Sequence, residues 1–172
     1  MKTFIKITAV VMALLLCCAA FASCGGGDSK GDSGSGGSSV AGETKTWGNI
    51  TVLVPEGMTL KGGNVLDEKD PDVVNISKKD NAMNYFLITI NDTEEGAKSG
   101  LETTKDTNKG KDATIDAGKK WTAVTYEYSG SPAFQAYAEF DGRFAVVQSF
   151  GFATDDDTTT AVLSSLKVKA AE

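Results

Sequence analysis

Apolar and polar residues alternate in several short segments of the chain, with the period of two that is typical of β-strands with one buried face. The first segment, Asn49 to Val54, ends at the turn sequence Pro55-Glu56-Gly57. The same pattern predicts further strands at 73–77, 83–91, 113–117, 120–128, 133–139 and 143–150. Because only short connections separate the last four, we expect them to form an antiparallel meander.

Two other segments carry helix signals. Thr93 precedes two glutamates and then apolar residues at helical spacing, which predicts a capped helix that reaches about Lys105. A second short helix is expected from Asp157, as its cap, to Leu166. The predicted fold class is therefore α+β: a largely antiparallel β-sheet, a meander in its main part, with two or more short helices packed on it.

The dipeptide Asp141-Gly142 lies between two alternating segments and is typical of a two-residue hairpin turn. Such a turn pairs Phe140 with Arg143, and alternation then assigns each side chain of the meander to one of two faces. One face is lined with alanines in its middle, which suits close packing of a helix. The other, which we call the tyrosine face, carries Val124, Tyr126, Tyr128, Gln135, Tyr137, Phe144, Val146, Gln148 and Phe150.

Two interpretations of the tyrosine face stay open. In one, a helix or loop covers it and each hydroxyl reaches solvent or a backbone partner. In the other, rigid aromatic side chains and amides form an open recognition surface for a peptide, a glycan or a partner protein. The residues of that candidate binding surface are Tyr126, Tyr128, Gln135, Tyr137 and Gln148.

The N-terminal segment has the order of a secretory signal peptide. Lys2 and Lys6 precede a ten-residue apolar run, and small residues follow it. The run is shorter than the roughly 20 residues that a membrane-spanning helix needs. The sequence Ala22-Ser23-Cys24 resembles the lipobox of bacterial lipoproteins, although Phe21 stands where leucine is usual.

The lipobox resemblance implies that Cys24 receives a diacylglyceryl group and becomes the first residue of the mature protein. The alternative is an ordinary signal peptide cut near Ala22, which would leave a free thiol. Thirteen of the eighteen residues from Gly25 to Gly42 are Gly or Ser, which is typical of a flexible linker. The expected organisation is a signal peptide at 1–23, a lipidated cysteine and linker at 24–42, and one globular domain at 43–172.

Charge and composition exclude several function classes. The formal net charge is −6, and removal of the two signal-peptide lysines makes it more negative. An acidic surface repels phosphate backbones and anionic headgroups, so we expect no nucleic-acid binding and membrane attachment only through the lipid on Cys24. The chain has no histidine, and no cysteine follows Cys24. A Ser-His-Asp triad and the usual zinc sites are thereby excluded, and no cofactor or metal is expected.

Carboxylates are the remaining candidates for chemistry. Glu127, Glu139 and Asp141 lie in the meander and would have to converge on one cleft to act as a hydrolase. Acidic clusters at 67–72 and 155–157 lack the ligand spacing of an EF-hand, so we expect a solvated loop and a helix cap there.

Three segments resemble the small α/β/α sandwich of PsbP-like and Mog1-like proteins. They are WGNITVLVPEGM at 47–58, DGRFAVVQSFGF at 141–152 and TTTAVLSSLKV at 158–168. The resemblance implies a non-enzymatic binding or assembly module, and it assigns no site residue.

The sequence thus predicts a bacterial cell-envelope lipoprotein that is anchored to a membrane and faces outside the cytoplasm. It would act as a binding or assembly module without catalysis. Two alternatives stay open: an extracytoplasmic lipoprotein that binds a small molecule, and a carboxylate-dependent hydrolase of envelope polymers.

Overall fold

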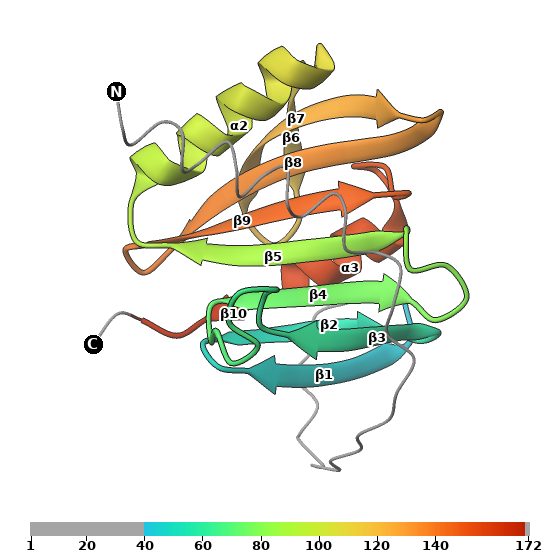
Figure 1. Cartoon of the computed structure of the whole chain (residues 1–172), viewed down its shortest axis with the longest axis vertical. Coiled ribbons are helices and arrows are strands. Elements are labelled where there is room, and N and C mark those ends of the chain that lie inside the picture. The colour runs from blue at the N-terminus through green and yellow to red at the C-terminus, as the bar shows by residue number, and fades with distance from the viewer. Residues whose placement is uncertain (1–39, 171–172) are drawn as a thin grey trace. The chain divides into compact units, whose positions relative to one another are not determined.

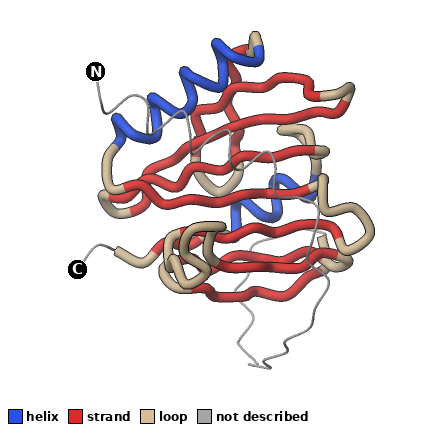
Figure 2. Tube along the Cα trace, in the orientation of Figure 1, coloured by secondary structure: helices blue, strands red, loops and turns tan. Residues whose placement is uncertain are grey.

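The computed structural model describes residues 40–170 and places their strands in two antiparallel sheets, with helices on opposite faces of the larger one (Figure 1). The expected signal peptide, the lipidation site Cys24 and most of the linker lie outside the described residues. Strands account for most of the ordered elements, as Figure 2 shows. The predicted α+β class is confirmed.

The larger sheet has seven strands in the order β3-β4-β5-β9-β8-β7-β6, and each neighbouring pair is antiparallel. Its strands are β3 Met58–Gly62, β4 Val73–Lys78, β5 Tyr85–Asn91, β6 Lys111–Asp116, β7 Lys120–Tyr128, β8 Ser131–Phe140 and β9 Arg143–Phe150. The meander predicted at the end of the chain is therefore β6 to β9, and β5 pairs with the last of its strands.

The long helix α2, Glu94–Asn108, makes the connection from β5 to β6. These strands are four places apart in the sheet, a distance of about 19 Å at 4.8 Å per strand. The helix has 15 residues and is about 22 Å long at 1.5 Å per residue. Its length therefore matches the crossing, and the chain must pass over β9, β8 and β7 on one face.

The smaller sheet and the second helix cover the opposite face. The smaller sheet has the order β1-β2-β10 and consists of β1 Gly42–Trp47, β2 Ile50–Pro55 and β10 Lys167–Val168. Helix α3, Asp157–Ser165, packs on β2. The main core lies between these elements and the larger sheet, and its fully buried side chains include Ile50, Phe86, Trp121, Phe134 and Leu163.

The hairpin predicted at Asp141-Gly142 is confirmed. Both residues have positive φ angles, 49° and 84°, and Phe140 pairs with Arg143. The assignment of side chains to two faces is therefore confirmed as well. The predicted four-residue connection from Ser129 to Pro132 was too long, because a second turn of the same kind occupies only Ser129 and Gly130, with φ of 52° and 76°.

Three strands were not predicted from the sequence, and the shortest of them, β10, has only two residues. Strand β1 is a polar edge strand that is mostly exposed, so it shows no alternation of apolar and polar residues. Strand β3 is short and alternates over only a few residues. The turn at 55–57 leads from the smaller sheet into the larger one, so β2 and β3 do not form a hairpin.

The helix caps agree with the sequence at one of two sites. Thr93 caps α2, and its hydroxyl accepts a hydrogen bond of 3.3 Å from the Gly96 N–H. The cap residue of α3 is Asp156 and not Asp157. The Asp156 carboxylate accepts a hydrogen bond of 2.7 Å from the Ala153 N–H, so it orders the preceding turn and leaves the helix N–H groups alone.

A buried arginine joins three loops to the larger sheet. Arg143, at the start of β9, donates from Nη2 to Asp72 Oδ2 at 2.9 Å and from Nε to Asp92 Oδ1 at 3.1 Å. Asn49 Nδ2 donates to the other Asp72 oxygen at 2.8 Å. Partial burial raises the pKa of Asp72, but the hydrogen bonds from Arg143 and Asn49 and the arginine charge lower it by more, so the pKa lies below the ordinary 3.8.

This network predicts a pH-dependent effect of Asp72→Asn. The folded-state pKa of Asp72 is depressed, so its contribution to stability is fully present above the unfolded-state pKa and is lost as pH falls through the folded-state pKa. We expect Asp72→Asn to lower the free energy of unfolding by about 1 kcal/mol at pH 7, a value reduced for partial exposure, and to have little effect near pH 2. Urea unfolding at both pH values measures the difference. Asp80→Asn, at an exposed position, is the control, and equal effects of the two variants would contradict the prediction.

Candidate functional site

Helix α2 covers only part of the tyrosine face. Ala97 and Leu101 are its buried apolar residues, and they form a small cluster with Val124 of β7 and Tyr137 of β8. The helix contacts β7 and β8 most and reaches β5 only at its margin, because it turns from β5 toward the far edge of the sheet (Figure 1). The part of this face over β4, β5 and the end of β9 has no helix on it.

Gln135 and Tyr137 lie beneath α2. They are 8% and 9% exposed, and the Thr104 hydroxyl donates a hydrogen bond of 2.5 Å to Gln135 Oε1. Gly100 lies directly over the same amide, and a Cβ atom there would be 3.1 Å from Gln135 Nε2. The absence of a side chain at Gly100 lets the helix approach the sheet closely. For these two residues, the interpretation of the face as covered describes the structure.

The other three residues of the candidate binding surface lie beyond the helix, and two of them belong to an aromatic cluster. The centroid of the Phe150 ring is 6.1 Å from that of Tyr126 and 5.2 Å from that of Tyr128, and both contacts are edge-to-face. The ring centroids of Phe150 and Tyr85 are 5.2 Å apart. Burial raises the pKa of Tyr126, and a hydrogen bond with Gln148 opposes this rise. Tyr128 is 39% exposed. Tyr126 and Phe150 are therefore the buried base of the cluster, and Tyr128 is its accessible rim.

Next to the aromatic cluster lies a surface that the sequence analysis did not find. The pairing of β4 with β5, and of β5 with β9, places side chains of these strands next to one another on the same face of the sheet as the tyrosines. We call the side chains on this face outward. Six half-buried members of this set, which we call the open strip, are Asn75, Ser77, Tyr85, Leu87, Thr89 and Gln148. The alternation within 73–77 and 83–91 was visible in the sequence, but the pairing of β5 with β9 was not.

The open strip is polar without charge. No outward position of β4, β5 or β9 carries an acidic or basic side chain, although 23% of the residues in the chain are charged. Within the described part of the chain, the side chains of Asn75, Ser77 and Thr89 make no hydrogen bond and are partly open to solvent. Their donors and acceptors are therefore available to a ligand.

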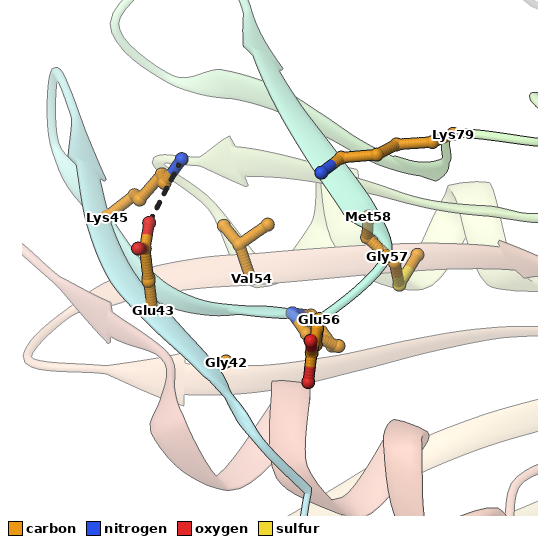
Figure 3. A pocket seen from close by; sticks show the side chains of 9 residues that line it. Gly42, Glu43, Lys45, Val54, Glu56, Gly57, Met58 and Lys79 are labelled. Atoms are coloured by element: carbon orange, nitrogen blue, oxygen red, sulfur yellow. Dashed lines mark ion pairs between the residues drawn. The ribbon is translucent and has the colours of Figure 1, made fainter.

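A separate hollow of about 340 Å³ lies where the end of β2 leads into β3 (Figure 3). Val54, Pro55 and Met58 are buried at its base, and charged side chains stand around it. One of these, Lys45, is 3.5 Å from Glu43 in an exposed ion pair. An open hollow with charged walls differs from the enclosed, mostly apolar pockets that hold small molecules.

The carboxylates proposed for hydrolysis are spread along the meander. Glu127 pairs with Pro132 near one end of β8, whereas Glu139 pairs with Phe144 near the other end. Seven residues of strand separate Pro132 from Glu139, or about 23 Å, so Glu127 and Glu139 do not share a cleft.

The acidic segment at 67–72 has a structural use. Asp67 and Asp70 accept hydrogen bonds of 2.9 Å from the Lys69 and Asp72 N–H groups, respectively. Over residues 40–170, no group of three or more carboxylates, cysteines or histidines is placed to hold a metal ion. In the same part of the chain, no helix has the length and apolar character needed to span a membrane.

No family model and no curated protein matches this sequence. The solution structure of cyanobacterial PsbP (CyanoP) from Synechocystis sp. PCC 6803 is similar, with a TM-score of 0.47 and 14% identity over 81% of this chain and 98% of that one. A crystal structure from Bacteroides thetaiotaomicron VPI-5482 is similar with a TM-score of 0.49 and 10% identity over 74% of this chain. This chain spans about half of that protein, 48%. At these identities the likeness concerns the fold alone.

Leu101→Ala tests how α2 is held on the tyrosine face. Leu101 is the largest buried side chain of the helix, so its truncation should lower the free energy of unfolding by about 2 kcal/mol and speed amide hydrogen exchange in α2 more than in β5 or β9. Urea unfolding and hydrogen exchange measure both effects. Leu66→Ala, at a position that is 88% exposed, is the matched control and should change the free energy by less than about 0.5 kcal/mol. Equal destabilisation by the two substitutions would show that α2 is not held in this way.

Proposed function

We propose that this protein is a lipid-anchored, non-catalytic binding module of the bacterial cell envelope, and that its docking surface is the open strip with the rim of the aromatic cluster. One observation carries the proposal: α2 leaves the surface over β4, β5 and the end of β9 uncovered, and no outward side chain of these three strands is charged. A surface of aromatic rings and unused hydrogen-bonding groups, held on a rigid sheet, has the composition of recognition sites.

The anchor in this proposal is Cys24. Attachment by charge is unfavourable for a chain with a net charge of −6, so a lipid must supply the membrane affinity. Each buried methylene contributes about 0.8 kcal/mol, and a single acyl chain binds only marginally. Two chains on one cysteine would give stable attachment, and the linker after it would let the domain turn toward its ligand.

Recognition without catalysis is part of the same proposal. The described domain has no histidine or cysteine, and Glu127 of β7 and Glu139 of β8 lie near opposite ends of this strand pair. The tyrosines of the aromatic cluster pack on one another, which suits contact with a ligand more than proton transfer to it.

Cys24→Ala tests the anchor. In cells that express the full-length protein, the variant should lose incorporation of radiolabelled palmitate and move from the membrane fraction to the soluble fraction, because no other part of the proposed mature protein holds it to lipid. Labelling and ultracentrifugation of cell lysates measure both effects. Cys18→Ala is the matched control and should leave labelling unchanged. Membrane association that persists in Cys24→Ala would refute lipid anchoring at this site.

Site-specific photocrosslinking in intact cells tests the docking surface. A photoreactive benzoylphenylalanine at Tyr128 replaces one exposed aromatic ring by another at the rim of the cluster, so it should form adducts with an envelope macromolecule. The same group at Thr114, an exposed position on the edge strand β6, is the control and should form none. Electrophoretic mobility of the affinity-tagged protein after irradiation reports the adducts. An unshifted band at both positions would refute the docking surface.

A further inference from the structure

We propose that the open strip binds a neutral glycan, a chain of uncharged sugars that lies across β4, β5 and β9. This inference rests on the proposed function and assigns the ligand class of the same surface. Three features carry it: the absence of charged outward side chains on β4, β5 and β9, the arrangement of the amides, and the position of the strip inside the sheet.

The absence of charge selects against ionic ligands. Phosphate polymers, acidic glycans and charged peptide side chains are recognised through groups of opposite charge, and the outward positions of β4, β5 and β9 offer none. A lysine, Lys61 of β3, pairs with Asn75 and lies at the end of the strip. The overall negative charge of the protein repels polyanions further. An uncharged polymer meets no such penalty, and it gains hydrogen bonds from Asn75, Ser77 and Thr89.

The amides lie at useful positions for sugar hydroxyls. Asn75 pairs with Leu87, and Leu87 pairs with Gln148, so the three side chains form one row across the sheet. Adjacent strands are about 4.8 Å apart, which separates the two amide-bearing strands by about 10 Å with an aliphatic side chain between them. Each amide both donates and accepts, as hydroxyl groups require, and Leu87 offers apolar contact to a sugar ring.

The next row supplies a fixed aromatic edge. Ser77 pairs with Tyr85, and Tyr85 pairs with Phe150. The ring centroids of Tyr85 and Phe150 are 5.2 Å apart, and the Tyr128 ring packs against Phe150 at the same centroid distance. Rings that are already packed lose little conformational entropy when a ligand arrives. The C–H groups of a sugar can therefore pack on this row while its hydroxyls face the amide row.

The position of the strip argues against an extended peptide. Peptides bind sheets mainly by adding a strand at an edge, where backbone N–H and C=O groups are unpaired. Strand β5 is paired on both sides, with β4 and with β9, so its backbone groups are already used. A ligand on this surface meets side chains only, which suits a polymer of hydroxyls better than one of amides.

Binding of defined oligosaccharides to the full-length lipoprotein in nanodiscs tests the inference. The probes are chitohexaose, cellohexaose and maltohexaose, with an oligomer of galacturonic acid as the anionic comparison, and isothermal titration calorimetry gives the dissociation constants. We expect at least one neutral hexasaccharide to bind with a dissociation constant below roughly 1 mM, and the anionic oligomer to bind at least tenfold more weakly. No heat of binding from any neutral probe, or preference for the anionic one, would overturn the inference.

Asn75→Asp and Asn81→Asp form the matched pair of variants. Each exchanges an amide for a carboxylate of the same shape, the first in the open strip and the second in the exposed loop before β5. We expect Asn75→Asp to weaken binding of the neutral probe at least tenfold and Asn81→Asp to leave it unchanged, with circular dichroism confirming that both variants are folded. Equal affinities of the two variants would place the sugar elsewhere and overturn the assignment.

The photocrosslinked adduct at Tyr128 separates this inference from the proposed function. An adduct that a hydrolase of a neutral glycan, such as chitinase, cellulase or amylase, shortens supports the glycan. An adduct that only protease removes overturns the glycan and leaves a docking surface for a protein. No adduct at all overturns both.

Discussion

The crossing from β5 to β6 is the constraint on which the rest of this structure depends. Because β5 pairs with β9, the chain must pass over three strands before it can start the meander, and α2 makes that passage on the face opposite to the main core. Its 15 residues are just enough for the distance, so one helix has to serve both as a connection and as a cover. The helix leaves the strands on the other side of β9 uncovered, and the sheet needs another way to protect its tyrosine face there.

The uncovered half protects itself with side chains that tolerate water. Phe150 is only 8% exposed although no helix lies on it, because Tyr85, Tyr126 and Tyr128 pack around its ring. Tyrosine suits this role, since its ring is apolar and its hydroxyl can remain hydrated. Amide and hydroxyl side chains continue the surface over β4 and β5 without adding charge. An uncovered sheet surface needs side chains that tolerate water, and here they are half-buried, uncharged and packed in place. Side chains with these properties also suit a recognition site.

The sequence predicted the local part of this arrangement and missed the long-range part. Asp141-Gly142 fixed the register of β8 on β9, so every tyrosine of the meander was assigned to the correct face. The partial cover could not be derived, because it follows from the pairing of β5 with β9, two strands more than 50 residues apart in the chain. For that reason Gln135 and Tyr137 entered the candidate surface although they lie under α2, and Asn75 and Tyr85 were left out of it. Strand β1 was missed because an exposed edge strand needs no apolar face.

The proposed docking surface lies in the middle of a sheet, and this position limits what a protein can do with a ligand. Catalysis usually requires groups that converge on one bond and exclude water from it, which a cleft or a closing loop provides. Strand β5 is hydrogen-bonded to a neighbouring strand on both sides, and Arg143 of β9 forms hydrogen bonds with Asp72 and Asp92 in the neighbouring loops. The described residues around the strip therefore form a rigid surface. Such a surface would lose little entropy on binding, and under the proposed function its affinity would come from many weak contacts along an extended ligand. The architecture therefore favours a polymer that spans several strands over a small molecule that must be enclosed.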